Sequence, residues 1–384
     1  MIQSPAEVNS FSKPLVVVTS DEPWSDVWHT QIHFAFQLSK IYNVIFLGPP
    51  SKWGFGTVFK SLAINKVSDS LIAIAYLNIL PARLGRFAVW FNDLFNEYVI
   101  SRMCKRFSWY DHFIVWHFDR YRSVHIWRSN QEVSHIYHVI DPVANLNYDR
   151  YLARFSDMVI VVSPRYLTHY QKLNKEVMLQ GQGFDPTFSG VIPKDLSEYQ
   201  PDSILLLGTL LDDVGFELLI EIAEKFKERK LVIIGPNRVA DPNRLNLLNH
   251  LLTLKNVIWT GPLPPEKHLP YIWASSVCLV AYEITGKVQG KNHILSTPLK
   301  VLTYLACKKP VVSNINCEIP SLKDHGIFEE FDEKSFIDRV GWCLNQKNAI
   351  DIDLVDGFLN DNNYPKIISR VIDRLSAIES SPQK

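Results

Sequence analysis

The chain has 384 residues, of which 47% are hydrophobic and 21% charged, and its formal net charge at pH 7 is zero. This composition is typical of a soluble globular protein, the length predicts two domains of similar size, and the balanced charge argues against bulk nucleic-acid binding. The sequence shows no signal-peptide pattern and no uninterrupted apolar run of about 18 residues. Five scattered cysteines without a CxxC pair indicate a reducing compartment, so we expect a cytoplasmic protein.

Short runs rich in Val and Ile in the first half predict the buried strands of a parallel sheet, because they are apolar on both faces and end in turn residues. Between the first two runs, residues 25–40 predict a helix with Ser25 as its N-cap, and another helix is expected to begin near Pro164. The runs are LVVV (15–18), NVIFLGP (43–49), HFIVWHF (112–118), HIYHVID (135–141) and MVIVVS (158–163).

The segment 55–110 interrupts this alternation because it is apolar, aromatic and basic. Its cations include Arg83, Arg86, Arg102, Lys105 and Arg106. One interpretation is a surface that contacts anionic lipid headgroups, so that the protein would lie at the inner face of a membrane. The other is a set of helices that cover the N-terminal sheet, with the basic side chains in solvent.

The strand–helix pattern restarts after a segment rich in Pro, Ser and Asp at 186–203, which is the best linker candidate. We therefore predict an α/β protein with two Rossmann-like, doubly wound domains that face a cleft. The predicted ranges are 1–185 for the first domain, 186–203 for the linker, 204–360 for the second domain, and 361–384 for a C-terminal helix that crosses back. Strands are expected at 204–208, 230–236, 256–261, 277–282 and 310–314, and helices at 215–228, 242–252, 265–276, 298–308, 332–346 and 364–379.

Five segments in order resemble the donor domain of GT-B glycosyltransferases, in particular glycosyltransferase family four of the bacterial cell-surface polysaccharide type. The opening DEPWSDVWHTQIHFAFQLSKIYNVIFLGPP is similar to the same class in a weaker way. The resemblance implies a nucleotide diphosphate sugar as donor, no cofactor and no bound metal. The five segments are DMVIVVSPRYL (157–167), GQGFDPTF (181–188), ILLLGTLLDDVGFELLIEIA (204–223), NVIWTGPLPPEKHLPYIWASSVCLVAY (256–282) and PLKVLTYLACKKPVV (298–312).

The chain departs from the family pattern at several positions. Two glutamates eight positions apart are replaced by Leu295 and Thr303, and the family lysine after the glycine loop is Val214. Lys308 occupies the position two residues before Pro-Val-Val at which the family usually has a glycine. Glu283 could replace a lost contact to the sugar, since it is a nearby carboxylate.

Lys300 is the strongest candidate for binding the donor diphosphate. An ammonium at a helix start adds a full charge to backbone N–H groups that already suit a phosphate. An exposed lysine on a first helical turn is the alternative interpretation. The other donor-binding candidates are Gly208, Thr209, Arg238, Gly261, Tyr282, Glu283, Ser296, Thr297 and Pro298.

Three residues at strand ends in the first half are candidates for catalysis. His117 and Asp119 follow one strand on the same side, and an imidazole titrates near neutral pH and can deprotonate or orient a hydroxyl. A hydrogen-bonded core histidine is the alternative. Asp21 follows the first strand and could contact a substrate or cap a helix.

Two patterns could suggest a metal site. His29 and His33 are four residues apart on a predicted helix but are more consistent with packing. The Asp-x-Asp at 351–353 lies between helices, so we reject it as a metal site.

These features predict a glycosyltransferase that moves a sugar to a glycan or lipid-linked acceptor, with retention at the anomeric carbon implied by the resemblance. Two alternatives remain open. A nucleotide-sugar epimerase would need no acceptor, and a non-catalytic scaffold subunit would explain the missing glutamates at Leu295 and Thr303.

Overall fold

The structure is a computed structural model that describes residues 15–25, 28–50, 64–106, 113–119, 133–140, 147–188, 192, 195–283, 297–346 and 349–380. These residues form two compact units. The first contains the described residues of Met1–Trp24, Gln31–Leu179 and Arg370–Lys384, and the second those of Ser25–Thr30 and Gln180–Ser369. The domain ranges predicted above, with a linker at 186–203, stay predictions.

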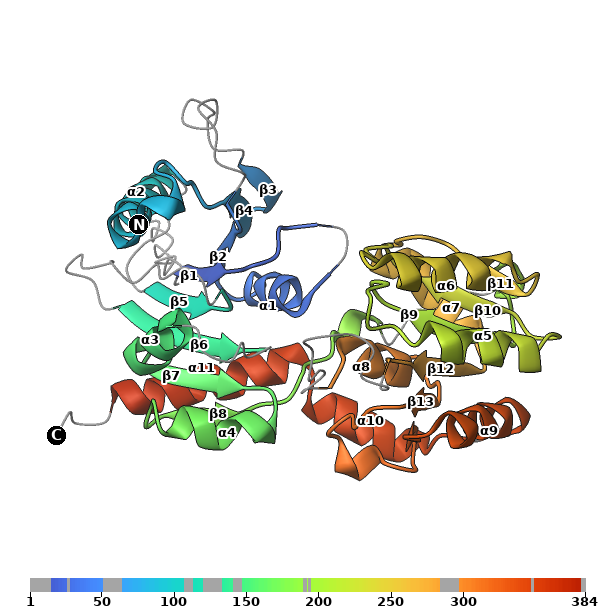
Figure 1. The fold of residues 1–384 in the computed structure, drawn as a ribbon. Helices are drawn as coiled ribbons and strands as arrows, with labels where there is room; N and C mark the ends of the chain where they lie inside the picture. Colours follow the sequence, from blue (N-terminus) through green and yellow to red (C-terminus); the bar gives the residue numbers. More distant parts are fainter. Residues whose placement is uncertain are drawn as a thin grey trace, which may run out of the picture. The chain divides into compact units, whose positions relative to one another are not determined.

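The first unit is built on an eight-stranded sheet in the order β3-β4-β2-β1-β5-β6-β7-β8, in which only β3 is antiparallel to its neighbour (Figure 1). The inner strands are buried on both faces, as the Val- and Ile-rich runs predict. Its strands are β1 (Leu15–Thr19), β2 (Asn43–Gly48), β3 (Asn65–Ser68), β4 (Leu71–Ala75), β5 (Phe113–His117), β6 (Val133–Val139), β7 (Met158–Val161) and β8 (Val177–Leu179). Its helical segments are α1 (Thr30–Leu38), η1 (Ala82–Leu84), α2 (Arg86–Arg106), α3 (Asn147–Phe155) and α4 (Pro164–Gln171).

The second unit is built on a six-stranded, fully parallel sheet in the order β11-β10-β9-β12-β13-β14. Its strands are β9 (Ile204–Leu207), β10 (Leu231–Ile234), β11 (Val257–Trp259), β12 (Val277–Val280), β13 (Val311–Ser313) and β14 (Ile327–Glu329). Its helical segments are η2 (Pro186–Phe188), η3 (Ser197–Tyr199), α5 (Phe216–Lys225), α6 (Pro242–Thr253), α7 (Pro265–Ala274), α8 (Leu299–Ala306), η4 (Pro320–Leu322), α9 (Glu333–Asn345), α10 (Ile352–Asp361) and α11 (Tyr364–Glu379), which continues into the first unit from Arg370.

Helices cover both faces of the second sheet, as Figure 1 shows for the yellow-green to red part of the chain. One core cluster joins the sheet to α5, α6 and α9 through side chains such as Phe216, Leu248 and Phe336. A second cluster joins the opposite face to α8 and α10 through Val301 and Val355. The apolar stripes of these helices therefore account for two cores on either side of one buried sheet.

Two details of the predicted elements need correction. The helix expected at 25–40 begins at Thr30, so Ser25 is not its N-cap. The aromatic and basic segment also contains the strands β3 and β4 before its long helix α2. In contrast, α4 begins at Pro164 as predicted, with the Ser163 hydroxyl accepting a hydrogen bond from the Arg165 amide. None of the helices formed by the described residues combines the length and the apolar character needed to span a bilayer.

Candidate functional site

The strand order of the second unit places a crevice between the ends of β9 and β12. In chain order its strands run 3-2-1-4-5-6, so the sheet is extended first in one direction from β9 and then in the other from β12. In open parallel sheets, ligands bind beyond the carboxyl ends of the strands at this point of reversal. Gly208 follows β9, and Tyr282 follows β12 closely. The candidate site is therefore built around these two strand ends.

The backbones that follow β9 and β10 touch each other at two glycines. Gly208 and Gly235 have φ angles of +139° and +145°, which side chains rarely adopt. A Cβ atom on Gly235 would stand only 2.0 Å from the Gly208 carbonyl oxygen. The Gly235 amide also donates to the Gly261 carbonyl at 2.9 Å. The ends of these three strands are thus held together mainly by backbone contacts, with the Trp259 indole of β11 also donating to the Gly235 carbonyl at 2.9 Å. No side chain stands on Gly208 or Gly235 where their backbones meet.

Helix α8 is fixed to this edge by Tyr304. The Tyr304 side chain is fully buried, and its hydroxyl accepts a hydrogen bond of 2.7 Å from the Leu207 amide, the last residue of β9. Lys300 lies one helical turn before Tyr304. The anchor therefore directs Lys300 toward the same strand end, as expected for side chains four residues apart.

The Lys300 ammonium reaches the crevice between β9 and β12. Its Nζ lies 3.2 Å from the point where a Cβ atom on Gly208 would stand, and 5.1 Å from the centre of the Tyr282 ring. It makes no ion pair or hydrogen bond with the residues that the structure describes. Burial lowers its pKa to about 8, and the negative charge of Asp213 opposes that shift. A partly buried cation that forms no ion pair with a carboxylate in the described part of the chain suits an anionic ligand.

Of the other predicted donor residues, Thr209 follows Gly208 and is partly buried, and Gly261 lies in the backbone contact described above. Arg238 is exposed after β10, and its amide donates to the Leu210 carbonyl at 2.9 Å. These residues all lie beyond the carboxyl ends of β9, β10 and β11. The structure therefore brings them to the same edge of the sheet as Lys300.

The predicted donor residues just before α8 differ in whether their side chains could reach a ligand. The Thr297 hydroxyl donates to the Cys317 carbonyl and is buried, so it is already engaged within the protein. Pro298 stands at the N-cap position of α8 and offers no side-chain cap. Ser296 and Leu295 lie outside the described residues. The helix start itself carries the predicted lysine in its first turn.

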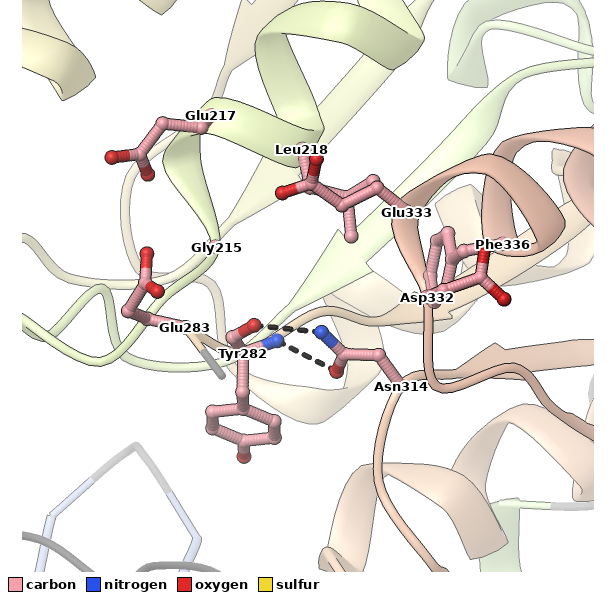
Figure 2. A pocket seen from close by; sticks show the side chains of 9 residues that line it. All are labelled: Gly215, Glu217, Leu218, Tyr282, Glu283, Asn314, Asp332, Glu333 and Phe336. Carbon is pink, nitrogen blue, oxygen red and sulfur yellow. Dashed lines mark hydrogen bonds between the residues drawn. The ribbon is translucent and has the colours of Figure 1, made fainter. Parts of the chain in front are cut away.

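A pocket next to this crevice is strongly acidic and is lined from α5, α9 and the ends of β12 and β13 (Figure 2). The Asn314 side chain binds the backbone at the end of β12. Its Oδ1 accepts a hydrogen bond from the Tyr282 backbone amide at 2.9 Å, and its Nδ2 donates one to the Tyr282 backbone carbonyl at 2.7 Å. Lys300 does not line this pocket. The lining residues are Gly215, Glu217, Leu218, Tyr282, Glu283, Asn314, Asp332, Glu333 and Phe336.

Arg244 of α6 balances part of this negative charge. Its guanidinium donates to both Glu217 oxygens at 2.9 and 2.8 Å and to Glu283 at 3.2 Å, and it also binds the Val214 carbonyl. The side chains of Arg244 and Glu283 are only 7% and 5% exposed. The predicted sugar contact of Glu283 therefore concerns a carboxylate that already has a buried cation as its partner.

Replacement of Arg244 by Gln is expected to destabilise the protein by about 2 kcal/mol, because Glu283 would remain buried without its cation. Chemical denaturation at pH 7 measures this loss. Arg229→Gln is the matched control, since Arg229 pairs with Asp202 on the surface and should matter by less than about 0.5 kcal/mol. Equal effects of the two substitutions would contradict the assignment of a buried ion pair.

Tyr304, Asn314 and Arg244 were not singled out from the sequence. Tyr304 lies within the quoted segment PLKVLTYLACKKPVV, so its spacing of four from Lys300 was available as a signal. Asn314 directly follows a predicted strand, which is also a recognisable position. Arg244 has no local signal, because its partners lie 27 and 39 residues away along the chain.

The catalytic candidates of the first unit lie at the equivalent point of its own sheet. Thr19 and His117 are paired at the ends of β1 and β5, where the strand order also reverses. His117 is fully buried, and its Nε2 lies 3.1 Å from Nδ1 of His135. Asp119 is buried as well. This is the environment of the hydrogen-bonded core histidine that the sequence left open, and the catalytic role of both residues stays a prediction.

Asp21 is partly buried and accepts a hydrogen bond of 3.1 Å from the Gln31 side chain of α1. It stands nine residues before the start of that helix and does not cap it locally.

The Asp-x-Asp pattern at 351–353 has a structural role. The Asp351 carboxylate caps α10, since it accepts a hydrogen bond from the Leu354 amide at 3.1 Å at the start of that helix. In the described part of the chain, no three His, Cys, Asp or Glu side chains are grouped so that they could hold a metal ion.

Comparison with known families matches residues 201–346 to the family described as "Glycosyl transferases group 1". This range contains all the strands of the second sheet, β9 to β14, together with Gly208, Gly235 and Lys300. A curated relative, the putative teichuronic acid biosynthesis glycosyltransferase TuaH of Bacillus subtilis, is 25% identical over 137 residues. That match covers 36% of this chain and 32% of the relative, so it spans only about a third of the relative's length.

Solved structures match nearly the whole chain at low identity. A glycosyltransferase from Rickettsia africae has a TM-score of 0.66 at 13% identity, covering 96% of this chain and 99% of that one. The sucrose-phosphate synthase of Thermosynechococcus elongatus has a TM-score of 0.66 at 15% identity, covering 95% and 100%. A structure described as "Trehalose-6-phosphate from E. coli bound with UDP-2-fluoro glucose" has a TM-score of 0.65 at 13% identity, covering 96% and 100%. These likenesses confirm the predicted GT-B fold with two Rossmann-like domains.

Proposed function

We propose that this chain, whose residues 201–346 belong to the group 1 glycosyl transferases, is a glycosyltransferase that uses a nucleotide diphosphate sugar. The observation that carries the proposal is the Lys300 ammonium, which has no ion-pair partner among the described residues and lies against Gly208 at the strand reversal. The UDP-2-fluoro glucose bound to the structurally similar E. coli protein supports the same class of donor.

In this proposal, Lys300 and the first turn of α8 bind the diphosphate of the donor. The ammonium and the helix dipole stabilise the negative charge that develops as the bond between the sugar C1 and the diphosphate oxygen breaks. The Gly208–Thr209 loop brings backbone groups close to the phosphate oxygens, because neither Gly208 nor Gly235 carries a side chain that would obstruct it. The reaction in this proposal requires no cofactor and no bound metal.

We propose that the transfer retains the anomeric configuration. The acceptor oxygen then forms its new bond to C1 on the face from which the diphosphate leaves, and a diphosphate oxygen takes the acceptor proton. His117, Asp119 or Asp21 would orient the acceptor. The TuaH relative and the lipopolysaccharide galactosyltransferase WaaB, a structural neighbour with a TM-score of 0.58, support a glycan or lipid-linked acceptor of cell-surface polysaccharide synthesis. We propose that this work takes place in the cytoplasm at the inner face of the membrane.

The test is to titrate the purified protein with UDP, GDP, ADP and CMP and with their common sugar conjugates. We expect one nucleoside diphosphate to bind selectively, and its sugar conjugate to be hydrolysed slowly when no acceptor is present. Isothermal titration calorimetry and release of free sugar measure the two events. No binding by the folded protein across this panel would overturn the proposal and favour the non-catalytic scaffold.

Lys227→Ala is a suitable control for variants of Lys300. Lys227 is exposed in the turn between α5 and β10, at the edge of the sheet where the strands begin. The Lys227→Ala substitution removes one positive charge from the same unit as Lys300, but at a distance from the crevice. We expect the Lys227→Ala variant to bind nucleotide with the affinity of the wild type.

A further inference from the structure

Helix α2 buries three polar side chains beside the apolar Ala88, Ile100 and Met103, and it exposes aromatic side chains, which an ordinary surface helix would bury. Asn92, Asp93 and Asn96 are at most 2% exposed and face the protein. Phe87, Trp90, Phe91 and Tyr98 lie on the outer side, and Leu84 precedes them in η1. The exposed fractions are 61% for Leu84, 66% for Phe87, 48% for Trp90, 38% for Phe91 and 58% for Tyr98.

The buried polar side chains hold the helix through hydrogen bonds to the segment after β4. Asn92 accepts from the Leu80 amide and donates to the Leu80 carbonyl, both at 2.8 Å. Asn96 makes the same pair of bonds with Leu77, at 2.9 and 3.0 Å. The Tyr76 hydroxyl donates to Asp93. These bonds fix the rotation of α2, so the outward direction of its aromatic side chains is specified by the fold.

The outer face also carries positive charge, and neither acidic residue of α2 is fully exposed. Arg102 and Lys105 follow Tyr98 at helical spacing and are exposed, and Arg83 is exposed in η1. The Arg102 guanidinium donates to the Tyr98 hydroxyl at 3.0 Å, and these three cations make no ion pair among the described residues. The acidic residues of α2 are Asp93, which is buried, and Glu97, which is partly buried and whose pKa is raised to about 7 by that burial.

This combination of side chains fits the interface of an anionic bilayer. Trp and Tyr, whose rings have an apolar body and a polar group, are enriched at the headgroup level. Phe and Leu form the apolar face of interfacial helices, and Lys and Arg bind anionic headgroups. A protein partner would also accept aromatic side chains, but a basic face on which α2 has no fully exposed carboxylate favours a surface of uniform negative charge. A contiguous apolar patch of this kind on a soluble protein marks an interaction site.

We infer that the outer face of η1 and α2, formed by Leu84, Phe87, Trp90, Phe91, Tyr98, Arg102 and Lys105, docks the protein onto an anionic phospholipid surface. The inference specifies the element and lipid charge of the membrane contact proposed above and does not depend on the nucleotide site. In this arrangement α2 lies in the plane of the interface. Its aromatic side chains enter the headgroup region while Asn92 and Asn96 remain bound to the protein.

Vesicle flotation tests the inference with the full chain at physiological salt. We expect binding to vesicles of phosphatidylcholine with about a third phosphatidylglycerol, and much weaker binding to phosphatidylcholine alone. Phe87→Ser with Trp90→Ser is expected to lower the affinity for the anionic vesicles by about tenfold or more. Arg102→Gln with Lys105→Gln is expected to lower it by a similar factor and to remove most of its salt dependence.

Ile352→Ser is the matched control, since Ile352 is 49% exposed on α10 of the second unit. It should bind vesicles like the wild type, and thermal denaturation should show all variants folded. Wild-type protein that does not float with the anionic vesicles would overturn the inference, as would unchanged binding of the Phe87 and Trp90 double variant.

Size-exclusion chromatography tests the alternative that this face joins two copies of the chain. A wild-type dimer that the Phe87 and Trp90 double variant converts to monomers would overturn the inference in favour of that alternative. Nucleotide titration of the same variants is expected to be unchanged, which separates a failure here from a failure of the proposed donor site.

Discussion

Gly235→Ala is expected to destabilise the second unit by more than about 3 kcal/mol. The new Cβ atom would stand 2.0 Å from the Gly208 carbonyl oxygen and 2.6 Å from its carbonyl carbon, and both are backbone atoms that cannot rotate away. The φ angle of +145° adds strain even if the neighbouring loop moves. Urea denaturation, followed by far-UV circular dichroism, measures the loss.

Gly181→Ala is the control for this substitution. Gly181 has no atom within 4 Å of an added Cβ and does not have a positive φ angle, so we expect its effect to stay within about 0.5 kcal/mol. A Gly235→Ala protein that is as stable as Gly181→Ala would show that the loops after β9 and β10 are not in contact. Any folded fraction of Gly235→Ala should also bind nucleotide more weakly, because the Gly208 loop must shift to admit the methyl group.

Lys300→Met is expected to weaken nucleoside diphosphate binding about 10- to 100-fold and at the same time to stabilise the protein at pH 7. Burial lowers the pKa of Lys300 from 10.5 to about 8, so the folded protein holds the ammonium at a cost at neutral pH. A neutral side chain of similar length removes that cost, which is on the order of 1–3 kcal/mol. Calorimetric titration and thermal denaturation measure the two opposite effects in one sample.

Diphosphate affinity and stability are expected to change in opposite directions as the pH rises. In the free protein Lys300 loses its proton as the pH rises through about 8, so diphosphate affinity should fall about tenfold between pH 7 and pH 9. Stability should rise over the window from about pH 8 to 10.5, because there the unfolded chain binds the proton more tightly than the folded one. Lys300→Arg keeps its charge and should flatten the affinity profile. An unchanged affinity in Lys300→Met would show that the diphosphate does not contact this residue.

The sequence predicts the second unit well because its strands are short, mostly buried and separated by helices with clear apolar stripes. Every predicted strand of that unit corresponds to one in the structure, from β9 to β13. The strand β14 was missed because Ile327–Glu329 offers only two apolar residues, Ile327 and Phe328, between turn and acidic residues. Helix α10 was missed since the interpretation of residues 351–353 dealt only with metal binding, although Asp351 is the N-cap of that helix.

The candidate site could be predicted only where it follows local rules. Lys300 and Gly208 were predicted because each stands at a strand end or helix start, which are positions that the sequence reveals. Arg244 and its carboxylate partners could not be predicted, since their pairing depends on how α6 packs against the ends of other elements. A similar limit applied to α2, whose hydrophobic pattern is uninformative until its buried asparagines are seen to bind the backbone at Leu77 and Leu80.

Lys308 illustrates how a departure from a family pattern is accommodated. It stands where the resembling family usually has a glycine, and its φ angle is +57°, in the left-handed region that glycine adopts without strain. Its side chain pairs with Asp356 of α10. The backbone thus keeps the turn between α8 and β13 even though the residue has changed.

The lowered pKa of Lys300 also determines how nucleotide binding exchanges protons with the solvent. A bound diphosphate would favour the charged ammonium and raise its pKa, so complex formation above about pH 7.5 takes up a fraction of a proton from the solution. That proton comes from the buffer, and its heat of ionisation is added to the heat of binding. The binding enthalpy measured at pH 8 should therefore differ between HEPES and Tris, which differ in heat of ionisation and do not compete as phosphate would, while the affinity stays the same in both.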